Sequence, residues 1–118
     1  AVCNKIGTYL KALAAKDNDI PFYVALPSST IDWSWDPEKN NIEIEERNPE
    51  EVLFTKGVLS NGAVAAVRTS PEGSAAANPA FDITPPELIS GLITDRGICE
   101  AKESSLLRLH PEGDIVKR

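Results

Sequence analysis

Residues 6–26, IGTYLKALAAKDNDIPFYVAL, carry the clearest architectural signal in the chain. Residues 17–19 are polar and end a predicted helix, and residues 22–26 then form a short, continuously apolar run. A helix followed by a fully apolar strand is typical of a parallel sheet with helices on its faces. The apolar residues of the first half recur at the spacing of one buried helix face; they are Ile6, Tyr9, Leu10, Leu13 and Ala14.

Two polar residues, Asn4 and Lys5, stand where this helix is predicted to begin. Helix N-termini bind anions because their first backbone N–H groups are unpaired and the helix dipole is positive there. The Lys5 side chain would add a full positive charge. The pair therefore predicts one wall of a phosphate or sugar-phosphate site, with ordinary helix capping as the alternative.

A second candidate segment follows the predicted strand. Ser28, Ser29 and Thr30 come just past its carboxyl end, which is where open α/β sheets bind ligands, so we expect them to line a pocket. None of them has a histidine at a recognisable spacing, and a Gly-x-Ser-x-Gly elbow is absent. Residues 31–41 read as a loop, in which Trp33 and Trp35 either pack onto the domain or a partner subunit or cover a pocket.

Local signals predict further elements along the middle of the chain. Residues 42–45 alternate in polarity and indicate a strand with one wet face. The Asn-Pro-Glu-Glu sequence at 48–51 indicates the start of a short helix. Residues 53–69 predict a β-hairpin around a two-residue turn at Asn61-Gly62, and the small residues 70–77 predict a mobile loop.

A second helix is predicted after Pro85. Thr84 and Glu87 fit a capping box, Pro85 fits the first helical position, and Gly97 fits the C-cap. Its buried face would comprise Leu88, Ile89, Leu92 and Ile93. Asn78 and Asp82 precede this helix, where we expect them to hydrogen-bond the loop backbone. A last short helix around residues 106–109 and a frayed end over 112–118 complete the prediction.

Composition excludes several classes of protein. The net charge of −6 and the pI of about 4.7 argue against a nucleic-acid-binding surface, which needs clustered lysine and arginine. No apolar run approaches the ~20 residues of a membrane span, and no signal-peptide pattern is present, so we expect a cytoplasmic protein. The chain begins with alanine and contains no methionine, from which we expect the C-terminal piece of a longer protein.

The remaining candidate ligands predict no metal site. Cys3 and Cys99 lack a metal-binding or disulfide spacing and read as two small buried hydrophobes. His110, the only histidine, precedes a proline and reads as a surface residue. The acidic residues between 43 and 51 read as a solvated strand face and helix start rather than as metal ligands.

Five motifs together give the chain a resemblance to the methylthioribose-1-phosphate isomerases over nearly its whole length. They are residues 4–9 (NKIGTY), 21–25 (PFYVA), 27–32 (PSSTID), 44–47 (IEER) and 78–85 (NPAFDITP). The first motif also resembles regulatory subunits of translation initiation factor two-B and ribose-1,5-bisphosphate isomerases. The third and fifth motifs favour the methylthioribose enzymes.

This resemblance implies an α/β fold in which residues 1–118 form the C-terminal part of a Rossmann-like domain. Its mostly parallel sheet would be flanked by helices and carry a β-hairpin insertion. The resemblance also implies a homodimer without a cofactor. The implied reaction is an aldose–ketose isomerisation in methionine salvage, which converts 5-methylthioribose 1-phosphate into 5-methylthioribulose 1-phosphate.

The resemblance further assigns substrate contact to Asn4 and Lys5. The cysteine and aspartate that the family is thought to use for proton movement lie upstream of Asn4. The chain would therefore hold no catalytic residue, would need an N-terminal portion of the same protein, and would be inactive alone. Two alternatives stay open: a non-catalytic regulatory or scaffold subunit on the same fold, and an isomerase of a related 5-deoxypentose 1-phosphate.

Overall fold

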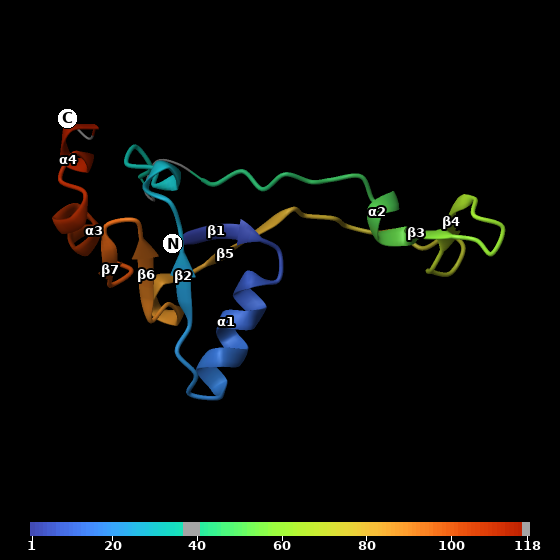
Figure 1. Ribbon diagram of the computed structural model, residues 1–118, viewed down its shortest axis with the longest axis horizontal. Helices are drawn as coiled ribbons and strands as arrows, with labels where there is room; N and C mark the ends of the chain where they lie inside the picture. The colour runs from blue at the N-terminus through green and yellow to red at the C-terminus, as the bar shows by residue number, and fades with distance from the viewer. Residues whose placement is uncertain (37–40, 117–118) are drawn as a thin grey trace. The chain divides into compact units, whose positions relative to one another are not determined.

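The computed structural model describes residues 1–36 and 41–116, which belong to two units. The first unit comprises Ala1–Glu43 and Asp82–Arg118, and the second comprises Ile44–Phe81. The helices and strands are labelled in Figure 1. In chain order they are β1 (Val2–Lys5), α1 (Thr8–Asp17), β2 (Tyr23–Ala25), the 3₁₀ turn η1 (Ser28–Thr30), α2 (Glu50–Leu53), β3 (Phe54–Val58), β4 (Val64–Arg68), β5 (Phe81–Thr84), the 3₁₀ turn η2 (Pro86–Leu88), β6 (Gly91–Thr94), β7 (Gly97–Cys99), α3 (Glu103–Leu109) and α4 (Gly113–Val116).

The first unit contains a three-stranded sheet in the order β2-β6-β7, visible as three adjacent arrows in Figure 1. Strand β2 runs parallel to β6, with Val24 opposite Leu92, and β7 is antiparallel to β6. Leu92 is buried at the centre of this sheet. The strand predicted at residues 22–26 and its parallel pairing are therefore confirmed. The fold is mixed α/β, but its sheets are small and mostly antiparallel rather than one broad parallel sheet.

The helix predicted after Pro85 is wrong. The chain makes the single 3₁₀ turn η2 and then enters β6. The Thr84 hydroxyl is buried without a hydrogen-bond partner, so no capping box forms. The apolar run that resembled a helix face instead pairs with β2, where Ser90 N donates to Phe22 O at 2.8 Å. Pairing with a distant strand thus outweighs a local helical spacing, which is ambiguous in a short apolar run.

Helix α1 is confirmed, but its predicted buried face is wrong. Thr8 and Ala12 are the buried residues of the helix, whereas Leu10 is 70% exposed and Tyr9 and Leu13 are also exposed. Helix α1 packs against the 3₁₀ turn η2. The apolar stripe of α1 is therefore largely uncovered by the described residues.

The hairpin predicted in the second unit is confirmed as β3 and β4, which are antiparallel from Phe54–Arg68 to Val58–Val64. Its loop has three residues rather than the predicted two. Leu59 N donates to Ala63 O, and Gly62 N donates to Leu59 O, each at 2.8 Å. Gly62 has φ 83°, as expected where a turn is followed by a left-handed residue.

Two other predictions in the second unit have opposite outcomes. The short helix is confirmed as α2, and the Asn48 carboxamide oxygen accepts from Glu50 N at 2.9 Å. The strand predicted at residues 42–45 is wrong, because the described backbone there forms only an isolated bridge between Glu46 and Pro79. Residues 70–77 form no helix or strand, as predicted, and their mobility stays a prediction.

The described C-terminal segment contains more helix than predicted. The last short helix is confirmed as α3, and α4 covers most of the segment expected to fray. Residues 117–118, like 37–40 of the predicted loop, lie outside the described residues. Cys3 is exposed and Cys99 half-buried, and both are free thiols, so the prediction of two buried cysteines is wrong. Among the described helices, none is long and apolar enough to span a bilayer.

Candidate functional site

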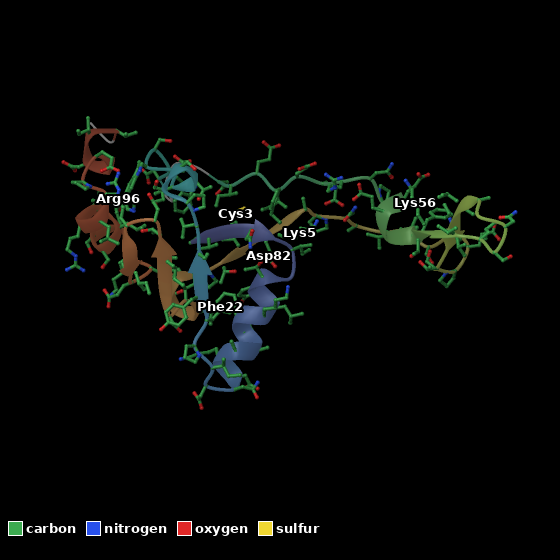
Figure 2. All side chains as sticks on the ribbon, viewed as in Figure 1. Cys3, Lys5, Phe22, Lys56, Asp82 and Arg96 are labelled. Atoms are coloured by element: carbon green, nitrogen blue, oxygen red, sulfur yellow. The ribbon has the colours of Figure 1, made fainter. Side chains whose placement is uncertain are left out.

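Asn4 and Lys5 are the last two residues of β1, so the prediction that they begin a helix is wrong by three residues. A tight turn at Ile6 and Gly7 follows, and α1 starts at Thr8. Gly7 has φ 101°, in the region that glycine adopts most readily. Both side chains are exposed. Figure 2 labels Lys5 at the end of β1, beside the start of α1.

The N-terminus of α1 is occupied by the carboxylate of Asp82. Gly7 N donates to Asp82 Oδ2 at 2.8 Å, and Tyr9 N lies 3.2 Å from both carboxylate oxygens. Asp82 reaches this position from β5, which pairs with β1 in a two-stranded sheet. The predicted backbone hydrogen bonding of Asp82 is thus observed, but its partners are 73 and 75 residues away. The helix end consequently has no free N–H groups at Gly7 and Tyr9 for a phosphate.

The Thr8 hydroxyl links the two candidate residues. Asn4 Nδ2 donates to Thr8 Oγ1 at 3.2 Å, and Thr8 Oγ1 donates to Lys5 O at 2.7 Å. Because Thr8 is buried, these bonds hold the Asn4 amide and the Lys5 backbone at a fixed place. Within residues 1–36 and 41–116, the Lys5 ammonium group forms no ion pair, so it is available to an anionic ligand.

The second candidate segment forms η1 at the carboxyl end of β2. Ser28 N donates to Asp95 Oδ1 at 3.2 Å, and Ser28 Oγ donates to Asp95 Oδ2 at 3.4 Å. Thr30 Oγ1 turns back to donate to Pro27 O at 2.9 Å, and Ser29 is exposed. In the described part of the chain, no hydrogen bond or ion pair joins this segment to Asn4 or Lys5.

Asp95 was missed by the sequence reasoning. It directly follows β6 and therefore lies at the same edge of the sheet as Ser28. Partial desolvation raises the pKa of Asp95, but hydrogen bonds from its own backbone N–H and from Ser28 outweigh this effect and hold the pKa below its ordinary value. A carboxylate just past the end of a strand would have indicated Asp95. This pattern was not recognised because residues 88–93 were predicted to form a helix.

The tryptophan loop packs on the C-terminal segment. The Trp33 ring lies 6.4 Å from the His110 ring, and a Cβ atom added at Gly113 would come within 2.5 Å of the Trp33 ring. His110 is 1% exposed, so the surface prediction for it is wrong. Its Nε2 lies 3.3 Å from Thr94 Oγ1. Of the two predicted roles of Trp33, packing onto the domain is the one observed.

Three acidic residues of the second unit, Glu45, Glu46 and Glu51, have structural partners. Arg47 pairs with Glu51 at 2.7 Å and with Glu45 at 3.4 Å, and Asn78 N donates to a Glu46 carboxylate oxygen. The hydrogen bond with Glu51 raises the pKa of Arg47. Over residues 1–36 and 41–116, no group of three or more histidine, cysteine, aspartate or glutamate side chains could hold a metal ion.

A hollow in the described surface lies elsewhere, between the sheet and α3. It has a volume of about 440 Å³ and contains neither Asn4 and Lys5 nor the η1 segment. Burial raises the pKa of its Cys99 thiol. Its lining residues are Tyr23, Ser90, Ile98, Cys99, Glu100, Ser105, Arg108 and Leu109. The lining includes one cation, Arg108, which donates to Ser105 Oγ at 3.0 Å.

Comparison with known proteins gives a consistent family match. The model of the Initiation factor 2 subunit family matches residues 1–101. The methylthioribose-1-phosphate isomerases of Brucella anthropi and Sinorhizobium medicae are 62% and 63% identical over 111 residues. Each alignment covers 94% of this chain and 30% of the relative. The chain thus spans about 30% of the length of these curated relatives.

Solved structures show the same likeness. The crystal structure of 5-methylthioribose 1-phosphate isomerase from Pyrococcus horikoshii matches with a TM-score of 0.73 and 40% identity, over 92% of this chain and 28% of that one. The translation initiation factor eIF-2B subunit delta from A. fulgidus matches with a TM-score of 0.74 and 37% identity, over 92% of this chain and 29% of that one. The fold alone therefore does not separate an isomerase from an initiation factor subunit.

Proposed function

Since the chain belongs to the initiation factor 2 subunit family, we propose that it is part of an aldose–ketose isomerase that acts on 5-methylthioribose 1-phosphate. The product is 5-methylthioribulose 1-phosphate, an intermediate of methionine salvage in the cytoplasm. The observation that carries the proposal is the 62% identity to a methylthioribose-1-phosphate isomerase across 94% of the chain. In the structural comparison, the isomerase and the initiation factor subunit reach 40% and 37% identity.

Asn4 and Lys5 form the substrate-binding contribution of this chain. The Lys5 ammonium group would neutralise the phosphate or a developing oxyanion, and the Asn4 amide would hold sugar hydroxyls. A charge-assisted hydrogen bond of this kind contributes about 1.5–3 kcal/mol. Because Asp82 already accepts hydrogen bonds from the α1 backbone, the phosphate contact falls to the Lys5 side chain rather than to the helix terminus.

Ser28, Ser29 and Thr30 line the opposite part of the pocket in this proposal. Their support is the position of η1 at the carboxyl ends of the parallel strands β2 and β6, the edge where α/β sheets bind ligands. No residue of the chain is assigned to proton transfer, and no cofactor is assigned to the reaction. The proton-transfer groups come from other residues of the same protein.

The sheet supports a larger Rossmann-like domain that includes residues 1–118. The register places Tyr23, Ile93 and Ile98 on one face of the sheet, and all three are exposed. The sheets of doubly wound folds are covered by helices on both faces. We therefore expect additional helices of the same protein to cover this apolar face, within a homodimer.

Turnover by the intact protein tests the proposed function. Purified protein incubated with 5-methylthioribose 1-phosphate should form the ketose phosphate, whereas a preparation of residues 1–118 alone should not. Failure of the intact protein to form product would overturn the proposal and favour a regulatory subunit, which the similarity to the initiation factor subunit supports. A parallel assay with a 5-deoxypentose 1-phosphate tests the choice of substrate.

A further inference from the structure

We infer that Asp82 is a positioning residue of the substrate site, which holds the Asn4–Lys5 pair in place through the N-terminus of α1. This inference rests on the proposed function, because it assigns a role within the same site. Asp82 lies on β5, and Figure 2 labels it beside Lys5 and the first turn of α1. It deepens the proposal by naming what fixes the geometry of the two substrate-contacting side chains.

The first step is the turn between β1 and α1. Two residues, Ile6 and Gly7, separate Lys5 from the helix. The Asp82 carboxylate accepts from Gly7 N at 2.8 Å and from Tyr9 N at 3.2 Å, so it bonds the chain within the turn and within the first helical residues. A carboxylate at a helix N-terminus also interacts favourably with the helix dipole. Asp82 therefore fixes the direction in which the chain leaves Lys5.

The second step is the connection from α1 back to the site. Thr8 lies between the two amides that Asp82 accepts from, and its hydroxyl donates to Lys5 O at 2.7 Å. The same hydroxyl accepts from Asn4 Nδ2 at 3.2 Å. A displacement of the first turn of α1 would consequently move the Thr8 hydroxyl and release the Asn4 amide. Asp82 is thus joined to both substrate-contacting residues by its bonds to Gly7 N and Tyr9 N, by the backbone of Thr8 between them, and by the bonds of the Thr8 hydroxyl.

The third step concerns charge. The Asp82 oxygens are engaged by two backbone N–H groups and occupy the place where a helix terminus would otherwise bind phosphate. Asp82 therefore repels a phosphate from the helix end and leaves Lys5 as its partner. Asp82 acts on the substrate only through Asn4 and Lys5, so it is a positioning residue rather than a catalytic residue.

Three variants of the intact protein test this role. Asp82→Ala removes both acceptor oxygens and should raise KM for 5-methylthioribose 1-phosphate about tenfold or more, because small displacements of positioning groups have large effects. Asp82→Asn keeps one acceptor oxygen and should restore part of the loss. Asp17→Asn removes the same charge at the opposite end of α1 and should leave KM unchanged.

A double variant shows whether Asp82 acts through Lys5. In a Lys5→Ala background, Asp82→Ala should reduce kcat/KM much less than it does alone, because residues of one network do not act additively. Fully additive losses, or an unchanged KM in Asp82→Ala, would overturn the inference. A lowered thermal midpoint with an unchanged KM would also overturn the inference, because it would show that Asp82 only caps α1 and stabilises the fold.

Amide hydrogen exchange gives a reading that does not need activity. In Asp82→Ala, the amides of Gly7 and Tyr9 should exchange about fivefold faster or more, the equivalent of one lost N-cap, and the Asn4 side-chain resonances should shift. Unchanged exchange at these amides would overturn the inference even in a protein without isomerase activity. Absence of turnover in the unmodified protein would count against the proposed function alone, so the two failures are distinguishable.

Discussion

Replacing Gly7 by alanine tests the geometry of the turn that carries the candidate site. Gly7 has φ 101°, and a Cβ atom placed on it would have no neighbouring atom within 4 Å. The substitution therefore adds backbone strain without a steric clash. An L-residue in the left-handed region costs about 1–2 kcal/mol. Alanine also reduces the conformational entropy of the unfolded chain, which stabilises the folded protein by about 0.4–1 kcal/mol. The net destabilisation is therefore about 1 kcal/mol.

Two control variants separate strain from the general effect of replacing glycine. Gly57 also has open space where an alanine methyl group would lie, but it has no positive φ, so Gly57→Ala should keep the unfolding free energy unchanged or raise it slightly. Gly7→Asn should lose less stability than Gly7→Ala, because asparagine adopts left-handed conformations more readily. The free energies of unfolding are measured by urea denaturation of the intact protein, with the midpoint and slope compared among variants.

The same variant has an expected effect on function. Relief of the strain at Gly7 would rotate the turn and weaken the 2.8 Å bond from Gly7 N to Asp82, so KM should rise in Gly7→Ala more than in Gly7→Asn. Equal stability of Gly7→Ala and Gly57→Ala would refute the reasoning from backbone conformation. An unchanged KM in Gly7→Ala would refute the link between this turn and substrate binding.

Gly113→Ala should destabilise the protein by about 1–3 kcal/mol through overpacking, because its Cβ atom would come within 2.5 Å of the Trp33 ring; denaturation followed by tryptophan fluorescence measures this, and an unchanged midpoint would contradict the packing. The folded-state pKa values of Asp95 and Glu112 lie below their ordinary values of 3.8 and 4.5. The stability that these two carboxylates contribute is therefore complete above the ordinary pKa values, and it is lost as the pH falls through the lowered folded-state pKa values. Denaturation midpoints measured from pH 6 to about pH 3 should therefore fall less steeply in Asp95→Asn than in the unmodified protein, and identical slopes would count against the Ser28 contact.

Elements encoded by local signals were predicted well from the sequence. The 3.6-residue spacing before Asp17 places α1, and the Asn61-Gly62 pair places the hairpin, although the loop length is set by the left-handed Gly62 rather than by the dipeptide alone. Leu92 and Ile93 are residues for which local signals gave the wrong secondary structure. Their spacing fits a helix, but pairing with β2 makes them part of a strand, and no local pattern reports a partner that distant.

For the candidate site, the roles of the named residues stay predictions, and their geometry differs from the one that the sequence indicates. Asn4 and Lys5 stand out as a polar pair in the sequence, yet they end a strand, and the helix terminus beside them is occupied by Asp82. That contact joins positions 75 residues apart and depends on the pairing of β1 with β5. His110 was misjudged for a similar reason, because Trp33 and Thr94, which lie beside its buried ring, are remote from it in sequence.

The central claim is that Lys5 binds the phosphate-bearing substrate of an isomerase, and one comparison of steady-state kinetics tests it directly. The intact protein and its Lys5→Ala variant are assayed with 5-methylthioribose 1-phosphate. Loss of a charge-assisted contact worth about 1.5–3 kcal/mol should lower kcat/KM at least about tenfold, with the thermal midpoint unchanged because Lys5 is exposed. An equal kcat/KM in the two proteins would contradict the account.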